Sequence, residues 1–483
     1  MSWTERHPYV FAIRLTDARN SADASARVVP AGADGPLVAD ERVAAHCEAR
    51  GTPQAGAVRE LWHPDGPVLV VGVGAQTLGE WRAAGAVAVR AMTGDGPLRV
   101  LLPAAVPDDA MRALVEGLWL GGYHVRTPRT EAVDVQLTGA PTDGAEARLR
   151  AAIEQARAVA SAVWFARDLT NAPASEKNPA WFADQVVDAA SGRVDLSVTV
   201  RDEQRLAAEG FGALLAVGGG SATPPRLVEM SYRPPAARQH IVLVGKGITF
   251  DTGGISIKTR EGMKLMKKDM AGAAAVVAAT LAAADLRLPV RVTTLAPLAE
   301  NAVSGSAYRP GDVIEHYDGT TTETTNSDAE GRLVLADALG YAVRDLRPDV
   351  VVDLATLTGA NAVALGRRTA ALYSHNDDLA AALVSAGEMA GEAMWQLPLP
   401  DDYTDLLRSD LADRHSSPAG GPGSVVAALF LREFLGDRVG DWAHLDMSAP
   451  SWSDSADGVL SKGATGWGAH MLVRWLERQG EAG

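Results

Sequence analysis

The sequence predicts an α/β protein with a smaller N-terminal α/β domain and a larger C-terminal α/β domain, whose mostly parallel central sheet is flanked by helices. Three observations support this prediction. The chain has 483 residues, which is more than one ordinary domain holds. Its hydrophobic content of 47%, with 22% charged residues, is typical of globular proteins. Short apolar runs alternate with helical patterns, as strands joined by crossover helices do.

The N-terminal domain is expected over residues 1–140. Its expected strands are YVFAIRL (9–15), PVLVVGVG (67–74) and LRVLLPA (98–104), and its expected helices lie near 79–93 and 107–121. The segment VVGVGAQTLG (70–79) lacks the glycine spacing of a dinucleotide-binding loop, so it predicts an ordinary strand, turn and helix. The polar segment 128–144, which contains Pro and Gly, predicts a domain boundary.

A long helix over 145–170 is expected to connect the two domains, because Ala, Glu and Arg mix there with recurring apolar positions. Asn171-Ala172-Pro173 ends it. The C-terminal domain then occupies 171–483. Its expected strands are 240–247, 290–298 and 349–357, and its expected helices lie near 264–285 and 331–346. The β-branched residues of these strands favour a sheet that is buried on both faces.

Composition excludes several classes of protein. A net charge of −15 disfavours binding to nucleic acid, which needs a basic surface. The single cysteine, Cys47, allows neither an internal disulfide nor a cysteine zinc site. The N-terminus has no basic start followed by an apolar core, and the Ala-rich run 271–284 is too short to span a bilayer. A cytoplasmic protein is therefore expected, with no membrane segment.

Common hydrolytic motifs are missing. The ten histidines form no HxxxH or HExxH pair, which excludes a zincin, and there is no GxSxG for a serine hydrolase. His444 is expected to be structural.

Four acidic residues stand out because each is adjacent to an apolar run of the C-terminal domain: Asp251, Asp269, Asp328 and Glu330. Asp269 could simply cap the Ala-rich helix that follows it, and the last two could belong to a solvated turn. Alternatively, carboxylates that converge in a partly buried site repel one another unless a cation neutralises them. Oxygen ligands suit Mg²⁺ and Mn²⁺, and Zn²⁺ when a nitrogen ligand joins them. The residues alone leave both interpretations open.

Five motifs together resemble the leucyl aminopeptidase family, also called cytosolic leucine aminopeptidase or aminopeptidase A. They are GKGITFDTGGISIK (245–258), KKDMAGAAAV (267–276), YRPGDV (308–313), NSDAEGRL (326–333) and ATLTGA (355–360). The resemblance covers the whole second domain in order and the first domain loosely. It implies a two-metal aminopeptidase that removes N-terminal residues from peptides by attack of a metal-bridging water.

The resemblance also implies the ligands of two divalent metal ions, Mn²⁺, Zn²⁺ or Mg²⁺. The ligands of one ion would be Lys246, Asp251, Asp269 and Glu330, and those of the other Asp251, Asp328 and Glu330. A lysine ligand must be neutral, which requires the metal to depress its pKa.

Further roles follow from the same resemblance. Lys258 would polarise the scissile carbonyl, Arg332 would hold a bicarbonate that serves as general base, and Asp269 would help to bind the substrate's α-amine. The pocket for the first side chain suits apolar, leucine-like residues and would be lined by Met266, Thr356 and Gly359. The family further implies peptide substrates and a homo-hexamer.

Two positions depart from the family pattern. Ser327 replaces a threonine but keeps the hydroxyl, so little effect is expected. Met447-Ser448-Ala449 replaces Ile-Ala-Gly, which puts a strict leucine preference in doubt. Two rival functions remain: a DNA-binding regulatory relative, which would need a basic stripe, and a Cys-Gly or other dipeptide-specific metallopeptidase.

Overall fold

The computed structural model describes residues 13–15, 26–64, 66–91, 98–103, 105–125, 133–138, 144–235 and 237–481. The chain forms two compact units. The first comprises Met1–Trp164 with Ser453–Gly463, and the second Phe165–Trp452 with Ala464–Gly483. The division falls inside the long helix α4 (Ala145–Asn171), the helix expected to connect the domains. The expected limits of the domains themselves stay a prediction.

The first unit is built on a seven-stranded sheet with the order β1-β7-β6-β2-β5-β4, and β3 pairs with β2. The five strands from β1 to β5 along this order are parallel, and β4 and β3 are antiparallel to their neighbours. The strands are β1 (Ile13–Leu15), β2 (Ala26–Gly32), β3 (Gly35–Pro36), β4 (Val58–Leu61), β5 (Val68–Gly74), β6 (Leu98–Pro103) and β7 (Val133–Thr138). The helices besides α4 are α1 (Glu41–Arg50), α2 (Leu78–Arg90) and α3 (Asp108–Gly121).

The expected elements of this unit are present where the structure describes them, with one correction. Residues 9–12, 92–93 and 104 lie outside the described residues. The segment 128–144, expected to be a boundary, contains β7, which lies between β1 and β6 in the sheet. Val133, Val135 and Leu137 alternate with polar residues, which is the period of a strand, but the flanking Pro and Gly residues dominated the prediction.

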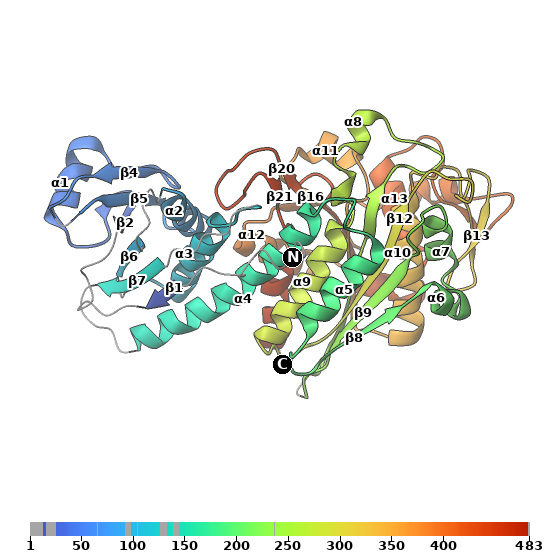
Figure 1. Ribbon diagram of the computed structural model, residues 1–483, viewed down its shortest axis with the longest axis horizontal. Helices are drawn as coiled ribbons and strands as arrows, with labels where there is room; N and C mark the ends of the chain where they lie inside the picture. Colours follow the sequence, from blue (N-terminus) through green and yellow to red (C-terminus); the bar gives the residue numbers. More distant parts are fainter. Residues whose placement is uncertain are drawn as a thin grey trace. The chain divides into compact units, whose positions relative to one another are not determined.

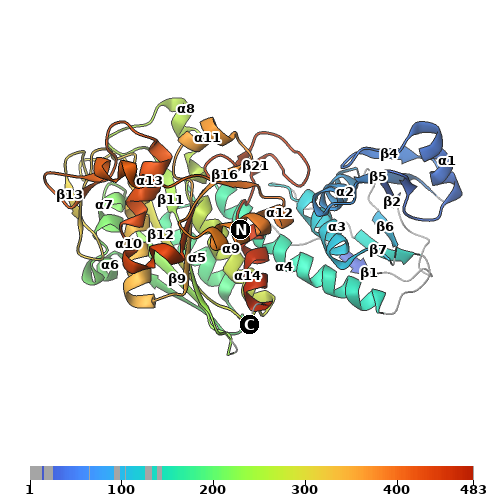
Figure 2. The same cartoon turned by 180° about the vertical axis from the view of Figure 1, so that it is seen from behind.

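The second unit contains a nine-stranded sheet with the order β17-β16-β19-β15-β10-β12-β9-β8, and β11 pairs with β12 (Figures 1 and 2). Its central strands β19, β15, β10 and β12 are parallel, and β16, β9 and β8 run antiparallel to their inner neighbours. The sheet strands are β8 (Leu196–Arg201), β9 (Arg226–Tyr232), β10 (His240–Gly245), β11 (Gly247–Asp251), β12 (Arg291–Asn301), β15 (Val350–Ala355), β16 (Ala370–Tyr373), β17 (Met394–Gln396) and β19 (Trp442–Asp446). The mostly parallel α/β architecture that the sequence predicts is confirmed.

Smaller elements complete this part of the chain. The short strands are β13 (Val313–Glu315), β14 (Thr321–Glu323), β18 (Arg414–His415), β20 (Trp452–Ser453) and β21 (Gly463–Ala464). The α-helices are α5 (Pro179–Ala190), α6 (Glu203–Glu209), α7 (Gly212–Gly218), α8 (Arg260–Met263), α9 (Ala271–Asp285), α10 (Glu330–Tyr341), α11 (Ala360–Leu365), α12 (Asp377–Ala390), α13 (Gly423–Arg432) and α14 (Ala469–Glu481). The 3₁₀-helices are η2 (Met266–Lys268), η4 (Asp401–Leu407) and η5 (Gly436–Asp441), and η3 (Ala342–Leu346) is a π-turn that extends α10.

Helices cover both faces of the second sheet. Val242 and Val244 of β10 share a core with α10 and α13. The next residue, Gly245, points the other way, because a Cβ there would lie 2.5 Å from the Cα of Ala273 in α9. The Ala-rich α9 is thus a core helix. No helix in the described part of the chain is long and apolar enough to cross a membrane.

The helix expected over 264–285 begins seven residues later than predicted. Residues 266–268 form the 3₁₀-turn η2, and α9 starts at Ala271. The N-cap of α9 is Met270, which makes no side-chain capping bond, so Asp269 does not cap this helix. Its carboxylate points instead at other side chains.

Candidate active site

The sheet of the second unit brings two loops together at the carboxyl ends of its parallel strands, where ligands of open α/β sheets bind. Lys246 lies between β10 and β11, is 3% exposed, and donates from Nζ to the carbonyl of Thr356, which follows β15, at 3.1 Å. Its aliphatic chain passes against Gly331, where a Cβ would lie 2.3 Å from Lys246 Cε. The glycine of NSDAEGRL is therefore required for the lysine to enter the site.

A tight turn after β11 positions both Asp251 and Lys258. Asp251 Oδ1 accepts from the backbone N–H of Gly253 and from Asn301 Nδ2, both at 2.8 Å. Gly253 and Gly254 have φ of 85° and 61°, the left-handed region that favours glycine. At this turn the chain reverses direction, which brings Lys258 next to the carboxylate of Asp251 at the end of β11.

Asp269 is presented by the η2 turn. Its Oδ1 accepts from Thr356 Oγ1 at 2.7 Å, and its Oδ2 lies 2.8 Å from Lys246 Nζ. The buried ammonium of Lys177 holds the same turn by donating to the carbonyl of Lys267 and, at 3.0 Å, to that of Thr170. The late start of α9 is what frees Asp269 for the site.

The segment 326–333 enters the site where α10 begins. The hydroxyl of Ser327 donates to the carbonyl of Gly253 at 2.7 Å and accepts from the N–H of Ser256 at 2.7 Å. The expectation that serine in place of threonine has little effect stays a prediction. Glu330 is the first residue of α10 and is 1% exposed.

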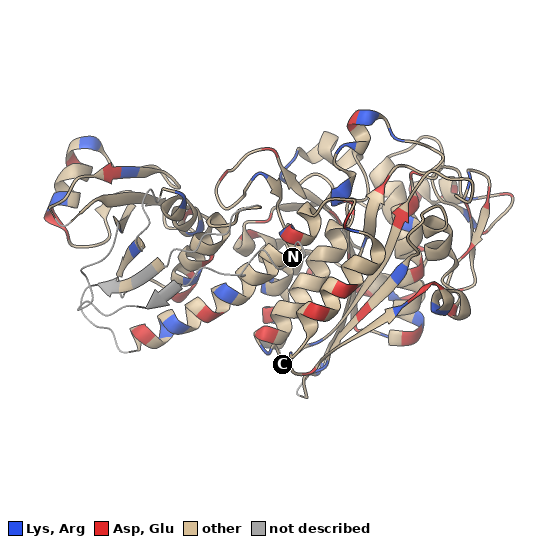
Figure 3. Ribbon diagram, in the orientation of Figure 1, with Lys and Arg blue, Asp and Glu red and all other residues tan. Residues whose placement is uncertain are grey.

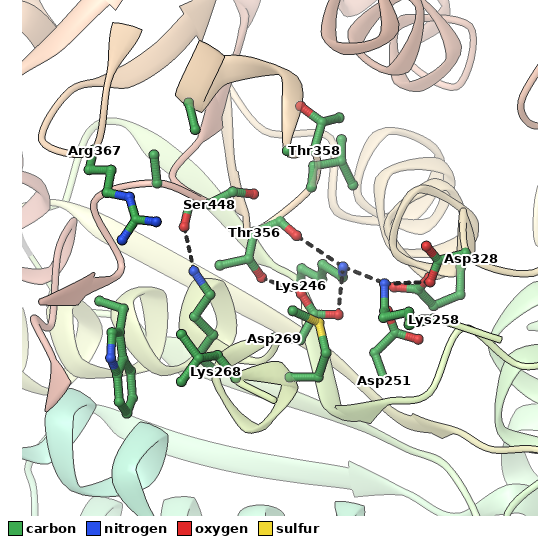
Figure 4. Close-up of a pocket in the computed structure, with 18 residues that line it drawn as sticks. Lys246, Asp251, Lys258, Lys268, Asp269, Asp328, Thr356, Thr358, Arg367 and Ser448 are labelled. Atoms are coloured by element: carbon green, nitrogen blue, oxygen red, sulfur yellow. Dashed lines mark hydrogen bonds and ion pairs between the residues drawn. The ribbon is translucent and has the colours of Figure 1, made fainter. Parts of the chain in front are cut away.

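The four acidic residues and two lysines line one cavity. Figure 4 labels five of them, Lys246, Asp251, Lys258, Asp269 and Asp328. Asp251, Asp328 and Glu330 each offer one oxygen, and these oxygens lie within 4.8 Å of one another. Lys246 Nζ also lies 2.9 Å from Glu330 Oε1. Lys258 Nζ lies 2.7 Å from Asp251 Oδ2 and contacts Asp328. The two ammonium groups leave the four carboxylates with an excess of negative charge.

Burial and mutual repulsion perturb the acids. Burial, followed by the charge of Asp251, raises the pKa of Glu330 to about 8. The same two causes raise the pKa of Asp328, and burial raises that of Asp269. Burial acts to lower the pKa of Lys246, but the surrounding carboxylates outweigh it and raise the pKa above its usual range.

The residues fit a divalent cation. Neither oxygen of Glu330 accepts a hydrogen bond of good geometry from the described residues, although Lys246 is close to Oε1. A buried carboxylate without donors is costly unless a cation binds it. The oxygens of Asp251, Asp328 and Glu330 form a cluster of the kind that hard divalent ions prefer. Asp269 lies outside that cluster, across the ammonium of Lys246 from Glu330.

These groups line one cavity of about 340 Å³. The predicted site residues on its wall are Lys246, Asp251, Lys258, Met266, Asp269, Asp328, Glu330, Thr356 and Gly359. Sequence reasoning assigned no role there to Leu265, Lys268, Leu357, Thr358, Ala362, Arg367 and Trp452. Ser448 and Ala449, which depart from the family pattern, also line the cavity.

Arg332 is the one predicted residue that does not line this cavity. It is 8% exposed and donates from Nη1 to the carbonyl of Ser416 at 2.7 Å, while its Nε has no partner among the described residues. Burial lowers the pKa of Arg332 to about 10, against the opposing charges of Glu330 and Asp446. It remains a cation at neutral pH.

Asp446, at the end of β19, shapes the cavity wall and was missed as a functional residue. Its carboxylate accepts from the N–H groups of Leu357, Thr358 and Ser448, and from the hydroxyls of the last two. It therefore ties the loop after β15 to the loop after β19. The segment WAHLD (442–446) ends on this residue, but a single Asp at a strand end is too common to be assigned a function from sequence.

His444 is structural, as expected. Its Nδ1 lies 2.6 Å from Asp353 Oδ1, and its ring stacks with those of Tyr373 and Trp442. Acidic and basic residues are interspersed along α4 (Figure 3), so this described helix carries no basic stripe of the kind that DNA binding requires.

Comparison with known proteins identifies what this site resembles. Residues 164–473 match the catalytic domain of the cytosol aminopeptidase family. A probable cytosol aminopeptidase of Streptomyces coelicolor is 43% identical over 499 aligned positions, which cover 94% of this chain and 96% of that one. One of Syntrophotalea carbinolica is 42% identical and covers 86% of each chain.

Solved structures agree. The bottromycin maturation enzyme BotP in complex with Mn has a TM-score of 0.85 and 39% identity, covering 95% of this chain and all of that one. A mutant of tomato leucine aminopeptidase has a TM-score of 0.83 and 30% identity, covering 97% and 96% of the two chains.

Proposed function

The chain belongs to the cytosol aminopeptidase family and is a metal-dependent exopeptidase, and on this basis we propose the role of each residue in the site. The main support for the proposal is the excess of buried carboxylates at the end of β11 and at the start of α10. They surround a cavity that is large enough for one amino-acid residue of a peptide.

The acidic cluster would hold two divalent ions. Asp251, Asp328 and Glu330 would bind one, and Asp251, Asp269, Glu330 and Lys246 would bind the other. The carboxylates around Lys246 outweigh its burial and raise its pKa, so this lysine would have to lose its proton to serve as a ligand. Bound divalent ions supply Lewis acidity and lower the pKa of coordinated water. The Mn complex of BotP supports Mn²⁺ as one of these ions, with Zn²⁺ or Mg²⁺ as alternatives.

The protein's own groups hold the substrate. The carboxylate of Asp269 accepts a hydrogen bond from the α-amine of the substrate. Because only the first residue of a peptide has a free α-amine, this contact restricts cleavage to that residue. Lys258, whose pKa is raised by Asp251 and Glu330 in spite of burial, stays protonated and hydrogen-bonds the scissile carbonyl as negative charge develops on it. Arg332, whose Nε has no partner among the described residues, would hold an anion such as bicarbonate, which would accept a proton as general base.

The first side chain of the substrate enters between Met266, Thr356 and Gly359, next to Leu265 and Ala449. These mostly apolar walls support cleavage of apolar, leucine-like residues. A preference for Cys-Gly or another dipeptide remains the second candidate, because Ser448 and Ala449 on this wall depart from the family pattern.

We also propose a homo-hexamer located in the cytosol, the place that the names of its relatives give. Light scattering on the purified protein tests the mass of the assembly.

The test of the activity uses leucyl peptides with protein stripped by chelation and then reloaded. Release of the N-terminal residue should vanish on chelation and return with Mn²⁺, Zn²⁺ or Mg²⁺. A chain that is folded and metal-loaded but releases no N-terminal residue from any peptide of a broad panel would refute the proposal.

A further inference from the structure

The turn that presents Asp269 is held from outside the cavity. Lys177 is 1% exposed, and its side chain does not line the cavity. Its Nζ donates to the carbonyl of Thr170 at 3.0 Å, to the carbonyl of Lys267, and to Met270 Sδ at 3.3 Å. A substrate in the cavity does not reach this amine, so Lys177 can affect the reaction only through the residues that it contacts.

The contacts of Lys177 lie on both sides of Asp269 in the chain. Lys267 precedes Asp269 by two residues, and Met270 follows it directly. Between them the backbone forms the 3₁₀-turn η2, in which the N–H of Asp269 donates to the carbonyl of Met266 at 3.2 Å. Hydrogen bonds of a 3₁₀ turn have poorer geometry than those of an α-helix, so bonds from side chains contribute more to its conformation.

The last turn of α4 anchors these contacts. Thr170 and Asn171 are the last two residues of this helix, and they are 2% and 4% exposed. The final carbonyls of a helix have no partner within it and favour positively charged donors. The carbonyl of Thr170 accepts from Lys177, and that of Asn171 accepts from Lys267 Nζ at 2.8 Å. The two lysines therefore tie the η2 turn to the buried end of α4.

The hydrogen bonds of Lys177 do not depend on its charge. Burial, followed by the charge of Lys267, lowers the pKa of Lys177, and the charge of Asp269 acts in the opposite direction. A protonated amine has three N–H donors, one for each of its three acceptors. A neutral amine still has two, which suffice for the two carbonyls. The backbone of the turn is therefore held in either protonation state.

We propose that Lys177 is a positioning residue for Asp269, and that it keeps this carboxylate where it binds the second metal ion and the α-amine of the substrate. This inference rests on the proposed function, to which the ligand role of Asp269 belongs. The carboxylate is held at its other end by Thr356 Oγ1, which donates to Oδ1 at 2.7 Å. Residues that orient a metal ligand typically change metal affinity by about 10- to 100-fold when they are mutated.

The experiment titrates the chelated, full-length protein with Mn²⁺ and measures free Mn²⁺ by electron paramagnetic resonance, which gives a Kd for each of two binding steps. Lys177→Met removes the N–H donors and keeps a side chain of similar length. It should weaken one step by about 10- to 100-fold, the same step that Asp269→Asn weakens, and leave the other step within about threefold. Lys177→Gln retains two N–H donors, so its Kd for that step should lie between those of Lys177→Met and the wild type.

A double-mutant cycle tests whether Lys177 acts through Asp269. If it does, adding Lys177→Met to Asp269→Asn should weaken Mn²⁺ binding by no more than about twofold further, because the effects of coupled residues are not additive.

The matched control is Thr280→Val in α9. Thr280 is fully buried, and its hydroxyl donates to the carbonyl of Val276 at 2.9 Å, further along the helix than the η2 turn. This variant should lower the free energy of unfolding and leave both Kd values unchanged, which separates positioning of Asp269 from a general loss of stability.

Three results would overturn the inference. Unchanged Kd values in Lys177→Met would show that the turn keeps its conformation without the lysine. An equal loss in both steps would show that Lys177 stabilises the whole site and not Asp269 in particular. Additive losses in the double variant would mean that Lys177 acts through another residue.

Failure of the proposed function would look different. A wild-type protein that binds fewer than two Mn²⁺ ions, or an Asp269→Asn variant that binds both ions normally, would count against the proposed ligands themselves. If Lys177→Met does not fold, Lys177→Gln replaces it in each of these comparisons.

Discussion

Helix α10 carries two buried carboxylates with opposite surroundings. Asp337 is completely buried, and donors surround it: Oδ2 accepts from the N–H of Leu214 at 2.9 Å, and Oδ1 accepts from the N–H of Tyr317 at 3.1 Å, with His316 Nδ1 at the same distance. Glu330, seven residues earlier, is 1% exposed, and neither of its oxygens accepts a good hydrogen bond from the described residues.

The neighbours of Glu330 are other acids and the ammonium of Lys246. Burial is therefore no guide to function by itself. A buried acid surrounded by donors stabilises the fold, whereas buried acids that face one another imply a cation from outside. The following predictions test this distinction, beginning with the largest expected effect.

Glu330→Gln keeps the shape of the side chain but removes the charge that both proposed ions share. Bound metal, measured by elemental analysis, should fall, and kcat/KM should drop by at least about 10³-fold, which corresponds to about 4 kcal/mol of transition-state stabilisation. Without metal the variant should be no less stable than the wild type. Normal metal content together with normal activity would remove Glu330 from the site.

Lys258→Ala should lower kcat by about 10²- to 10³-fold while metal content is retained, because it removes a hydrogen-bond donor to the developing negative charge and not a ligand. Lys264→Ala is the matched control and should be fully active. An active Lys258→Ala enzyme would show that the carbonyl is polarised by another group.

Metal binding should stabilise only a protein whose acidic cluster is intact. At a free metal concentration about 100 times Kd, the free energy of unfolding should rise by about 2.7 kcal/mol over that of the chelated wild type. Thermal melts should show the same increment in Asp337→Asn and none in Glu330→Gln. An equal increment in all three would mean that the ion binds elsewhere.

Asp337→Asn should behave in the opposite way to Glu330→Gln. The amide cannot accept from all three donors, so the unfolding free energy should fall by about 2 kcal/mol. Activity per folded, metal-loaded molecule should stay within about twofold of the wild type. A selective loss of metal from this variant would contradict the structural role given to Asp337.

His240 is a buried basic residue that, like the acidic Asp337, has a hydrogen-bond partner within the fold, the hydroxyl of Thr293. Burial and the charge of Arg291 lower its pKa from the usual 6.5 to about 4, so it is neutral in the folded protein. Since the unfolded chain binds the proton more readily, stability is lost as the pH falls from about 6.5 towards 4. Between pH 7.5 and 5.5 this contribution is about 1.4 kcal/mol, and denaturant melts of His240→Gln should lack it.

The sequence predicted the acidic cluster more fully than the cavity around it. Asp251, Asp328 and Glu330 lie at a strand end and a helix start, and local patterns locate both. Lys268 and Arg367 carry no such pattern, since they are 99 residues apart in the chain and meet only at the cavity wall. Arg332 was expected in the site, yet its guanidinium turns to the carbonyl of Ser416 and lies outside the cavity lining.

Local sequence also misplaced two elements. The helix expected from 264 begins at Ala271, because the segment before it serves the site: Lys177 holds the η2 turn, and Asp269 contacts Lys246. Residues 128–144 contain the strand β7, because pairing with β1 and β6 outweighs the polar composition of this segment.

By itself, the sequence determined the α/β class, the buried parallel strands and the identity of the acids, because hydrophobic period and residue chemistry are local properties. Only the tertiary structure decided which charges neutralise one another. Coulomb interactions depend on distances between loops that are far apart in the chain. The fold of these loops places four carboxylates and the two lysines Lys246 and Lys258 around one cavity.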